Sequence, residues 1–139
     1  MPTLPWKVVE QPQPNSDLLF LASRLNLRSA RHIPGFFQSA LKVRRQVLQS
    51  PGAVGVSLLA QPLRKTFWTL SAWADQAALD AFVGSQPHLG IMARYHARFV
   101  NPEFTTWTGS ASSLPRTGSN AENLWADGKQ RLAAQRSAS

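Results

Sequence analysis

One short segment of the chain, residues 66–73 (TFWTLSAW), constrains the fold more than any other. Its aromatic and β-branched residues predict a strand, in which successive side chains point to opposite faces of the sheet. One face carries three apolar side chains, those of Trp68, Leu70 and Ala72. The other face carries two aromatic rings and two hydroxyls, those of Phe67, Trp73, Thr69 and Ser71. Because bulky side chains occur on both faces, we expect both faces of the sheet to be covered.

The segments around this strand predict alternating strands and helices. Three further apolar segments have strand length, namely residues 18–27, 53–60 and 103–109. Pro34 opens a helix whose apolar residues recur at helical spacing as far as Pro51-Gly52. A second helix follows Asp75, a favourable N-cap residue, and Pro87 opens a further helical turn. The order βαββαβ predicts a ferredoxin-like α+β fold, with a four-stranded antiparallel sheet and both helices on one face.

The two ends of the chain differ in composition from this central domain, which spans residues 17–109. Four prolines within residues 1–16 predict an extended N-terminal arm. Residues 110–139 begin with a linker rich in serine, and residues 121–136 could form a last helix, which Gly128 weakens. Two alternatives stay open for that segment: it packs on the domain or on a partner, or it is disordered.

The overall composition excludes several classes of protein. The 139 residues include no cysteine, which excludes disulfides, cysteine-ligated zinc and thiol catalysis. No run of apolar residues is long enough to span a membrane, and we expect a cytoplasmic protein. The net charge is +8, but the basic residues are scattered and not interleaved with stacking aromatic residues, so we expect no nucleic-acid partner.

The second face of the predicted sheet needs a cover that the two helices do not supply. The simplest candidate is a second copy of the same sheet, which predicts a homodimer with a cavity between the two sheets. Ser23, Thr69 and Ser71 would add a few hydroxyls to a mostly apolar lining. Such a composition is typical of a small-molecule pocket, but it also fits an ordinary packed interface.

Residues 66–92, TFWTLSAWADQAALDAFVGSQPHLGIM, also carry a family resemblance. They resemble the pattern T-L-S-x-W-x-(D/E)-x-x-A-L-x-x-F-x-x-S-x-x-H-x-x-x-M of the antibiotic-biosynthesis-monooxygenase-like superfamily, and look most like its DUF3291 and spheroidene-monooxygenase types. The resemblance implies a dimeric α/β barrel, and the order of elements extends it over about residues 18–109. Members include cofactor-independent oxygenases of polycyclic phenols, haem-degrading oxygenases and haem-binding enzymes.

The haem-degrading members use an asparagine, a tryptophan and a histidine at three positions that can be compared. The tryptophan matches Trp73, whereas the asparagine falls on Ser23 and the histidine on Met92. Two of the three residues differ, so we do not predict haem degradation. His88 matches the histidine of the pattern above, for which the resemblance defines no role.

His88 is the candidate catalytic residue, since histidine suits proton transfer or metal ligation. A structural role at the start of a helix is the alternative. His88, Met92 and His96 would share one face of a continuous helix, but no carboxylate lies nearby in the sequence, so we predict no metal site. Arg24 is a candidate counter-charge for an enolate, if it points inward. We predict that the ligand-binding residues are Phe67, Thr69, Ser71, Trp73, Ser23, Met92 and Phe104.

The leading function is a small-molecule-binding protein, interpreted as a cofactor-independent monooxygenase of an aromatic or polyene-like substrate. In that reaction the protein orients the substrate, removes a proton and excludes water. We expect no cofactor. The alternatives are a haem-binding protein with His88 as axial ligand and a non-catalytic dimeric module whose tryptophan-rich face is an interface.

Overall fold

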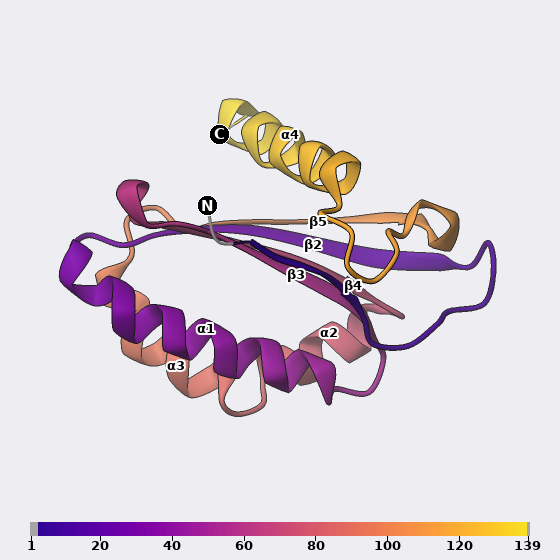
Figure 1. The fold of residues 1–139 in the computed structure, drawn as a ribbon, viewed down its shortest axis with the longest axis horizontal. Coiled ribbons are helices and arrows are strands. Elements are labelled where there is room, and N and C mark those ends of the chain that lie inside the picture. The colour runs from indigo at the N-terminus through magenta and orange to yellow at the C-terminus, as the bar shows by residue number, and fades with distance from the viewer. Residues whose placement is uncertain (1–2, 139) are drawn as a thin grey trace.

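In the computed structural model, which describes residues 3–138, one sheet lies between two helical layers (Figure 1). The strands are β1 (Thr3–Val8), β2 (Asp17–Asn26), β3 (Ala53–Gln61), β4 (Thr66–Trp73) and β5 (Glu103–Ser110). The helices are α1 (Ile33–Leu48), α2 (Gln76–Val83), α3 (His88–Tyr95) and α4 (Glu122–Ala138). The sheet order is β1-β3-β4-β2-β5, with every neighbouring pair antiparallel. The βαββαβ order of the predicted ferredoxin-like α+β fold is confirmed.

The central strand β4 is covered on both faces, as its sequence predicts. On the face toward α1 and α2, Phe67 packs edge-on against Phe36, and Trp73 packs against Phe82 with 5.0 Å between ring centroids. On the opposite face, Leu70 is fully buried. Asp75 caps α2, because its Oδ1 accepts a hydrogen bond of 2.8 Å from the backbone N–H three residues later. Local signals therefore fix the strand, its two faces and the start of the next helix.

The second face of the sheet is covered by α4 of the same chain, as Figure 1 shows above the sheet. The buried residues of this layer from the C-terminal segment are Ala121, Leu124, Trp125 and Leu132. The C-terminal segment therefore packs on the domain, which is one of the alternatives that the sequence leaves open, and a second copy is not needed to cover this face. Homodimerisation through the face stays a prediction, and it now requires α4 to leave the sheet or to take part in the contact.

Gly128 explains how α4 approaches the sheet so closely. A Cβ atom at this position would lie 3.2 Å from the Cβ of Ala22 on β2 and 3.4 Å from the ring of Trp107 on β5. A glycine costs a helix about 1 kcal/mol relative to alanine. Here the cost is offset by the apolar contact that the missing side chain allows, so Gly128 marks the packing face of α4.

The N-terminal arm is a fifth strand rather than a separate extension, so the expectation of a four-stranded sheet is wrong. β1 pairs with β3 at the edge of the sheet, where a strand tolerates a proline such as Pro5. Trp6 is buried against Gly55, where a Cβ atom would meet its ring at 2.2 Å. The Trp6 backbone N–H also donates to the Ser119 carbonyl at 2.8 Å, which joins the arm to the linker before α4.

Within residues 3–138, no helix combines the length and the apolar character needed to cross a bilayer.

Candidate functional site

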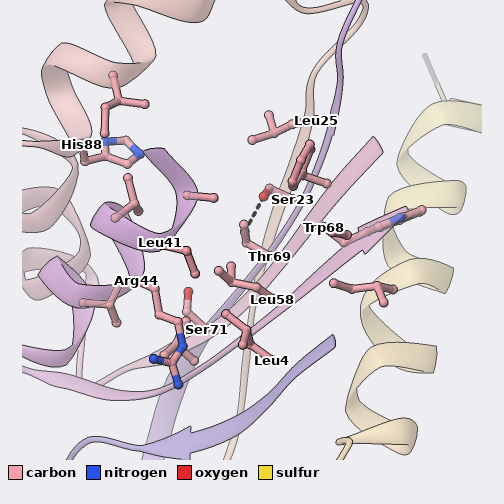
Figure 2. A pocket seen from close by; sticks show the side chains of 18 of the residues that line it. Leu4, Ser23, Leu25, Leu41, Arg44, Leu58, Trp68, Thr69, Ser71 and His88 are labelled. Carbon is pink, nitrogen blue, oxygen red and sulfur yellow. Dashed lines mark hydrogen bonds between the residues drawn. The ribbon is translucent and has the colours of Figure 1, made fainter. Parts of the chain in front are cut away.

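An apolar pocket of about 130 Å³ lies inside one chain, between the sheet and helices α1 and α3 (Figure 2). Short side chains line it from both sides, among them Ser23 and Thr69 of the strands and Ala40 of α1. A cavity between the sheets of two copies stays a prediction, but the hydroxyls of Ser23, Thr69 and Ser71 that were expected there line this pocket instead, on the face that the predicted helices cover. Its location follows from small residues on both walls rather than from a dimer interface.

The predicted site residues mostly lie together around this pocket. Seven of them line it, namely Ser23, Phe67, Thr69, Ser71, His88, Met92 and Phe104. Trp73 does not line the pocket: it is fully buried against Phe82, with its Nε1 atom donating 2.9 Å to the Ser71 Oγ. We therefore assign Trp73 to the core and leave it out of the ligand-contacting set.

Three hydroxyl groups provide the polar surface of the strand wall. Ser23 and Thr69 are opposite each other in the β2–β4 register, and their side-chain oxygens are hydrogen-bonded to each other. The Ser71 Oγ accepts from the Trp73 indole, which leaves its own proton available as a donor. The wall can therefore donate hydrogen bonds to a ligand while staying almost free of charge.

His88 lies on the opposite, helical wall, as Figure 2 shows, and two contacts fix it. Its backbone N–H donates 2.8 Å to the Oε1 of Gln46 on α1. Its ring Nδ1 lies 3.2 Å from the Val83 carbonyl oxygen, and because a carbonyl can only accept, Nδ1 carries the hydrogen. The Nε2 atom is then left with a lone pair that can accept a proton.

The environment of His88 favours the neutral imidazole. Burial, the larger effect, lowers the pKa of His88 from 6.5, and the hydrogen bond to Val83 opposes that effect without cancelling it. The ring also packs against Phe82, with 4.9 Å between centroids. At neutral pH the side chain is therefore unprotonated and able to act as a general base.

Gln46 is a residue that the sequence analysis missed. Besides accepting the His88 N–H, its Nε2 atom donates 3.1 Å to the Phe82 carbonyl and 3.4 Å to the Ser85 carbonyl. One side chain of α1 thus holds the end of α2 and the start of α3 together. No pattern in the sequence indicates a contact between residues this far apart.

Arg44 is the second missed residue, and here the sequence contains a signal. It falls four residues after Ala40 and three after Leu41, within the apolar stripe of α1. The structure places it among the pocket-lining residues, half-buried, with no hydrogen-bond partner for its buried Nε among residues 3–138. A charged residue on an otherwise apolar stripe is the signal that could have identified it.

Other candidates lie away from the pocket. Arg24 pairs with Glu103 at 3.2 Å and lies over the Trp68 ring, which points toward α4 in Figure 2. The condition that Arg24 points inward is therefore not met, and it is no longer a candidate counter-charge. α3 ends at Tyr95, and His96 is exposed, so the row of His88, Met92 and His96 is broken. Among the described residues, no group of three His, Cys, Asp or Glu side chains could hold a metal ion.

The sequence matches no family profile and no curated protein, but the fold matches solved structures. SnoaB, a cofactor-independent oxygenase from Streptomyces nogalater, is 19% identical with a TM-score of 0.55, covering 68% of this chain and 94% of SnoaB. An antibiotic-biosynthesis-monooxygenase-like protein from Nitrosomonas europaea is 10% identical with a TM-score of 0.59, covering 70% of this chain and 94% of that one. A conserved protein from Methanosarcina mazei is 12% identical with a TM-score of 0.58, and the match covers 65% of this chain and 90% of that one.

The fold is therefore that of the antibiotic-biosynthesis-monooxygenase-like proteins, as the motif in residues 66–92 indicates. At these identities the likeness shows the fold alone, and the chemistry depends on the residues of the pocket.

Proposed function

We propose that the pocket between the sheet and α1 binds a small aromatic ligand, and that His88 removes a proton from it in a cofactor-independent oxygenation. The observation that carries this proposal is the position of His88. Its Nδ1 is engaged by Val83, and the ring stands on the wall of an apolar cavity. The likeness of the fold to that of SnoaB supports the same reaction class as an analogy.

The size of the cavity narrows the ligand class. A cavity of about 150 Å³ in another protein binds benzene, so one of about 130 Å³ has room for about one six-membered ring. Pockets for larger ligands usually measure about 300–1,000 Å³. We therefore propose a monocyclic aromatic ligand rather than a polyene or a polycyclic phenol.

The chemistry requires little of the protein beyond position and a base. His88 Nε2 takes a proton from an activated C–H or O–H group, and the resulting anion transfers electrons to O₂. A ring C–H ortho or para to the phenolate oxygen is then converted to a carbonyl, giving a quinone, with one oxygen atom from O₂, while the second leaves as water. Apolar walls such as Phe67 and Ile91 keep bulk water away from the anion.

Oxygen uptake tests this function directly. With a panel of monocyclic phenols and hydroquinones, we expect the wild-type protein to consume O₂ and His88→Gln to lose about 10²-fold or more of the rate, the usual contribution of a general base. Ligand binding should persist in the variant. His96→Gln is the matched control, because His96 is exposed and outside the pocket. Equal rates in wild type and His88→Gln would remove the assignment of the base.

Haem binding is the alternative with His88 as ligand. The cavity, with room for about one ring, does not fit a porphyrin of four pyrrole rings. We therefore derive no step through haem. A haemin titration tests this conclusion: a saturable Soret shift that His88→Gln abolishes would favour haem. Ligand binding without any oxygen uptake would favour the non-catalytic module.

A further inference from the structure

We propose that Arg44 makes the pocket selective for a monocyclic aromatic carboxylate, with the carboxylate at Arg44 and the reacting group at His88. This inference rests on the proposed binding of a ring in the pocket. It adds the chemical class of the ligand and a residue that determines specificity.

Arg44 carries an unpaired donor in the described part of the chain. The Nε atom is buried and has no hydrogen-bond partner among the described residues. A buried donor without a partner is unfavourable, because it has lost its hydrogen bonds to water. In the described part of the chain, the arginines that form salt bridges are Arg24, Arg131 and Arg136. A ligand oxygen beside Arg44 would relieve that cost.

The lining of the pocket contains few ionisable side chains. No acidic side chain is among the pocket-lining residues, and the ionisable ones are Arg44 and His88. Since His88 is neutral at pH 7 by the argument above, Arg44 provides a single fixed positive charge in an apolar lining. A charge in a poorly polarisable environment interacts more strongly than one in water, so an anionic ligand is favoured over a neutral one of the same shape.

Arg44 and His88 are separated along the pocket. Figure 2 shows His88 near one end of the pocket and Arg44 near the other, with Arg44 reaching from α1 toward the region of Ser71. An arginine can hold a carboxylate through two parallel hydrogen bonds, and the Ser71 hydroxyl can add a third. A ring bound in this way presents the group opposite its carboxylate to His88.

A matched pair of ligands tests this selectivity. 4-Hydroxybenzoate carries the carboxylate, and 4-hydroxybenzamide has nearly the same shape without the charge. Dissociation constants of both are measured at pH 8 by isothermal titration calorimetry, so that His88 stays neutral. We expect wild type to bind the carboxylate at least about ten-fold more tightly, as a charge-assisted hydrogen bond allows.

Variants at Arg44 assign this preference to one residue. Arg44→Met keeps an unbranched apolar stem, and we expect it to bind both ligands with the affinity that wild type shows for the amide. Arg44→Lys should keep part of the preference, because it retains a charge but not the planar fork. Arg45→Met is the matched control, because Arg45 is the next residue and is exposed outside the pocket lining. This variant should prefer the carboxylate over the amide as strongly as wild type does.

The outcomes separate this inference from the proposed function. If wild type binds both ligands equally, or if Arg44→Met keeps the ten-fold preference, the inference is overturned while the pocket still binds a ring. If neither ligand binds to the folded wild-type protein at millimolar concentration, the proposed ligand class and the inference both fail. Retention of the preference in Arg44→Lys and its loss in Arg44→Met would support the inference even if the methionine variant is less stable.

Discussion

The ring Nδ1 of His88 lies 3.2 Å from the carbonyl oxygen of Val83, the last residue of α2. This contact fixes the tautomer, and the burial of the ring lowers its pKa from 6.5. A histidine at the start of a helix usually faces water. Here the two helices α2 and α3 turn it onto the wall of the pocket, where the neutral form is favoured.

The low pKa of His88 makes the free energy of unfolding depend on pH. The unfolded chain binds a proton near pH 6.5, whereas the folded chain does so only at lower pH. His88 therefore destabilises the fold progressively as the pH falls below about 6.5, until the folded-state pKa is passed. Urea unfolding at pH 7.5, 6.5 and 5.5 should show a smaller loss of stability on acidification in His88→Gln. Parallel pH dependences in the two proteins would contradict the assigned burial.

Removal of Gln46 should disturb His88 without touching the pocket wall. Gln46→Ala loses the acceptor of the His88 N–H and the donor to two carbonyls, and leaves these groups without their partner. We expect a loss of about 1–3 kcal/mol in unfolding free energy and a reduced rate of oxygen uptake. Gln38→Ala, at an exposed position of the same helix, should change stability by less than about 0.5 kcal/mol. Equal stability of the two variants would show that Gln46 does not hold α2 and α3.

Enlargement of Gly128 should separate α4 from the sheet. A leucine at this position has no room against Ala22 and Trp107. We therefore expect Gly128→Leu to lower the free energy of unfolding by about 1–3 kcal/mol, although leucine has the better helix propensity. Limited proteolysis should then cut the linker before α4 faster than in wild type. Ala126→Leu is the control, since Ala126 is exposed on the same helix. Unchanged stability and proteolysis in Gly128→Leu would mean that α4 does not cover the sheet in solution.

The predicted homodimer can be tested by light scattering. A dimer has twice the 15.3 kDa mass of the chain, and we expect that value at micromolar concentration. Because α4 covers the sheet face, the strength of the dimer in Gly128→Leu shows which surface forms the contact between the two copies. A dimer that uses the sheet face should strengthen when α4 is released, whereas one that uses the outer side of α4 should weaken. A monodisperse monomer of wild type would contradict the prediction.

The sequence predicts the local structure of this protein well because local signals are strong. The alternation in residues 66–73 separates the two faces of β4, and the stripe after Pro34 predicts α1. These signals depend on neighbouring residues and on backbone geometry. They also bring Ser23, Phe67, Thr69 and Ser71 to the strand wall of the pocket, since β2 and β4 pair in the register that places Ser23 opposite Thr69, whereas His88 and Met92 reach the pocket from α3.

The errors concern long-range contacts. Alternation shows that the second face of β4 needs a cover, but it does not tell whether α4 or a second chain supplies it. The prolines of the N-terminal arm mask β1, because an edge strand tolerates residues that a central strand does not. The location of the pocket depends on which short side chains of α1 lie opposite short side chains of β4 in the core. The periodicity of either segment alone does not predict which residues of the two segments face each other.

The central claim is that a single aromatic ring binds between the sheet and α1. The chain has two methionines, Met1 and Met92, and the second lines the pocket. With ¹³C-methyl-labelled methionine, titration with 4-hydroxybenzoate should shift the Met92 signal saturably by the ring current of the ligand. Met92→Leu assigns the two signals. A Met92 signal that does not move at millimolar ligand would contradict the claim.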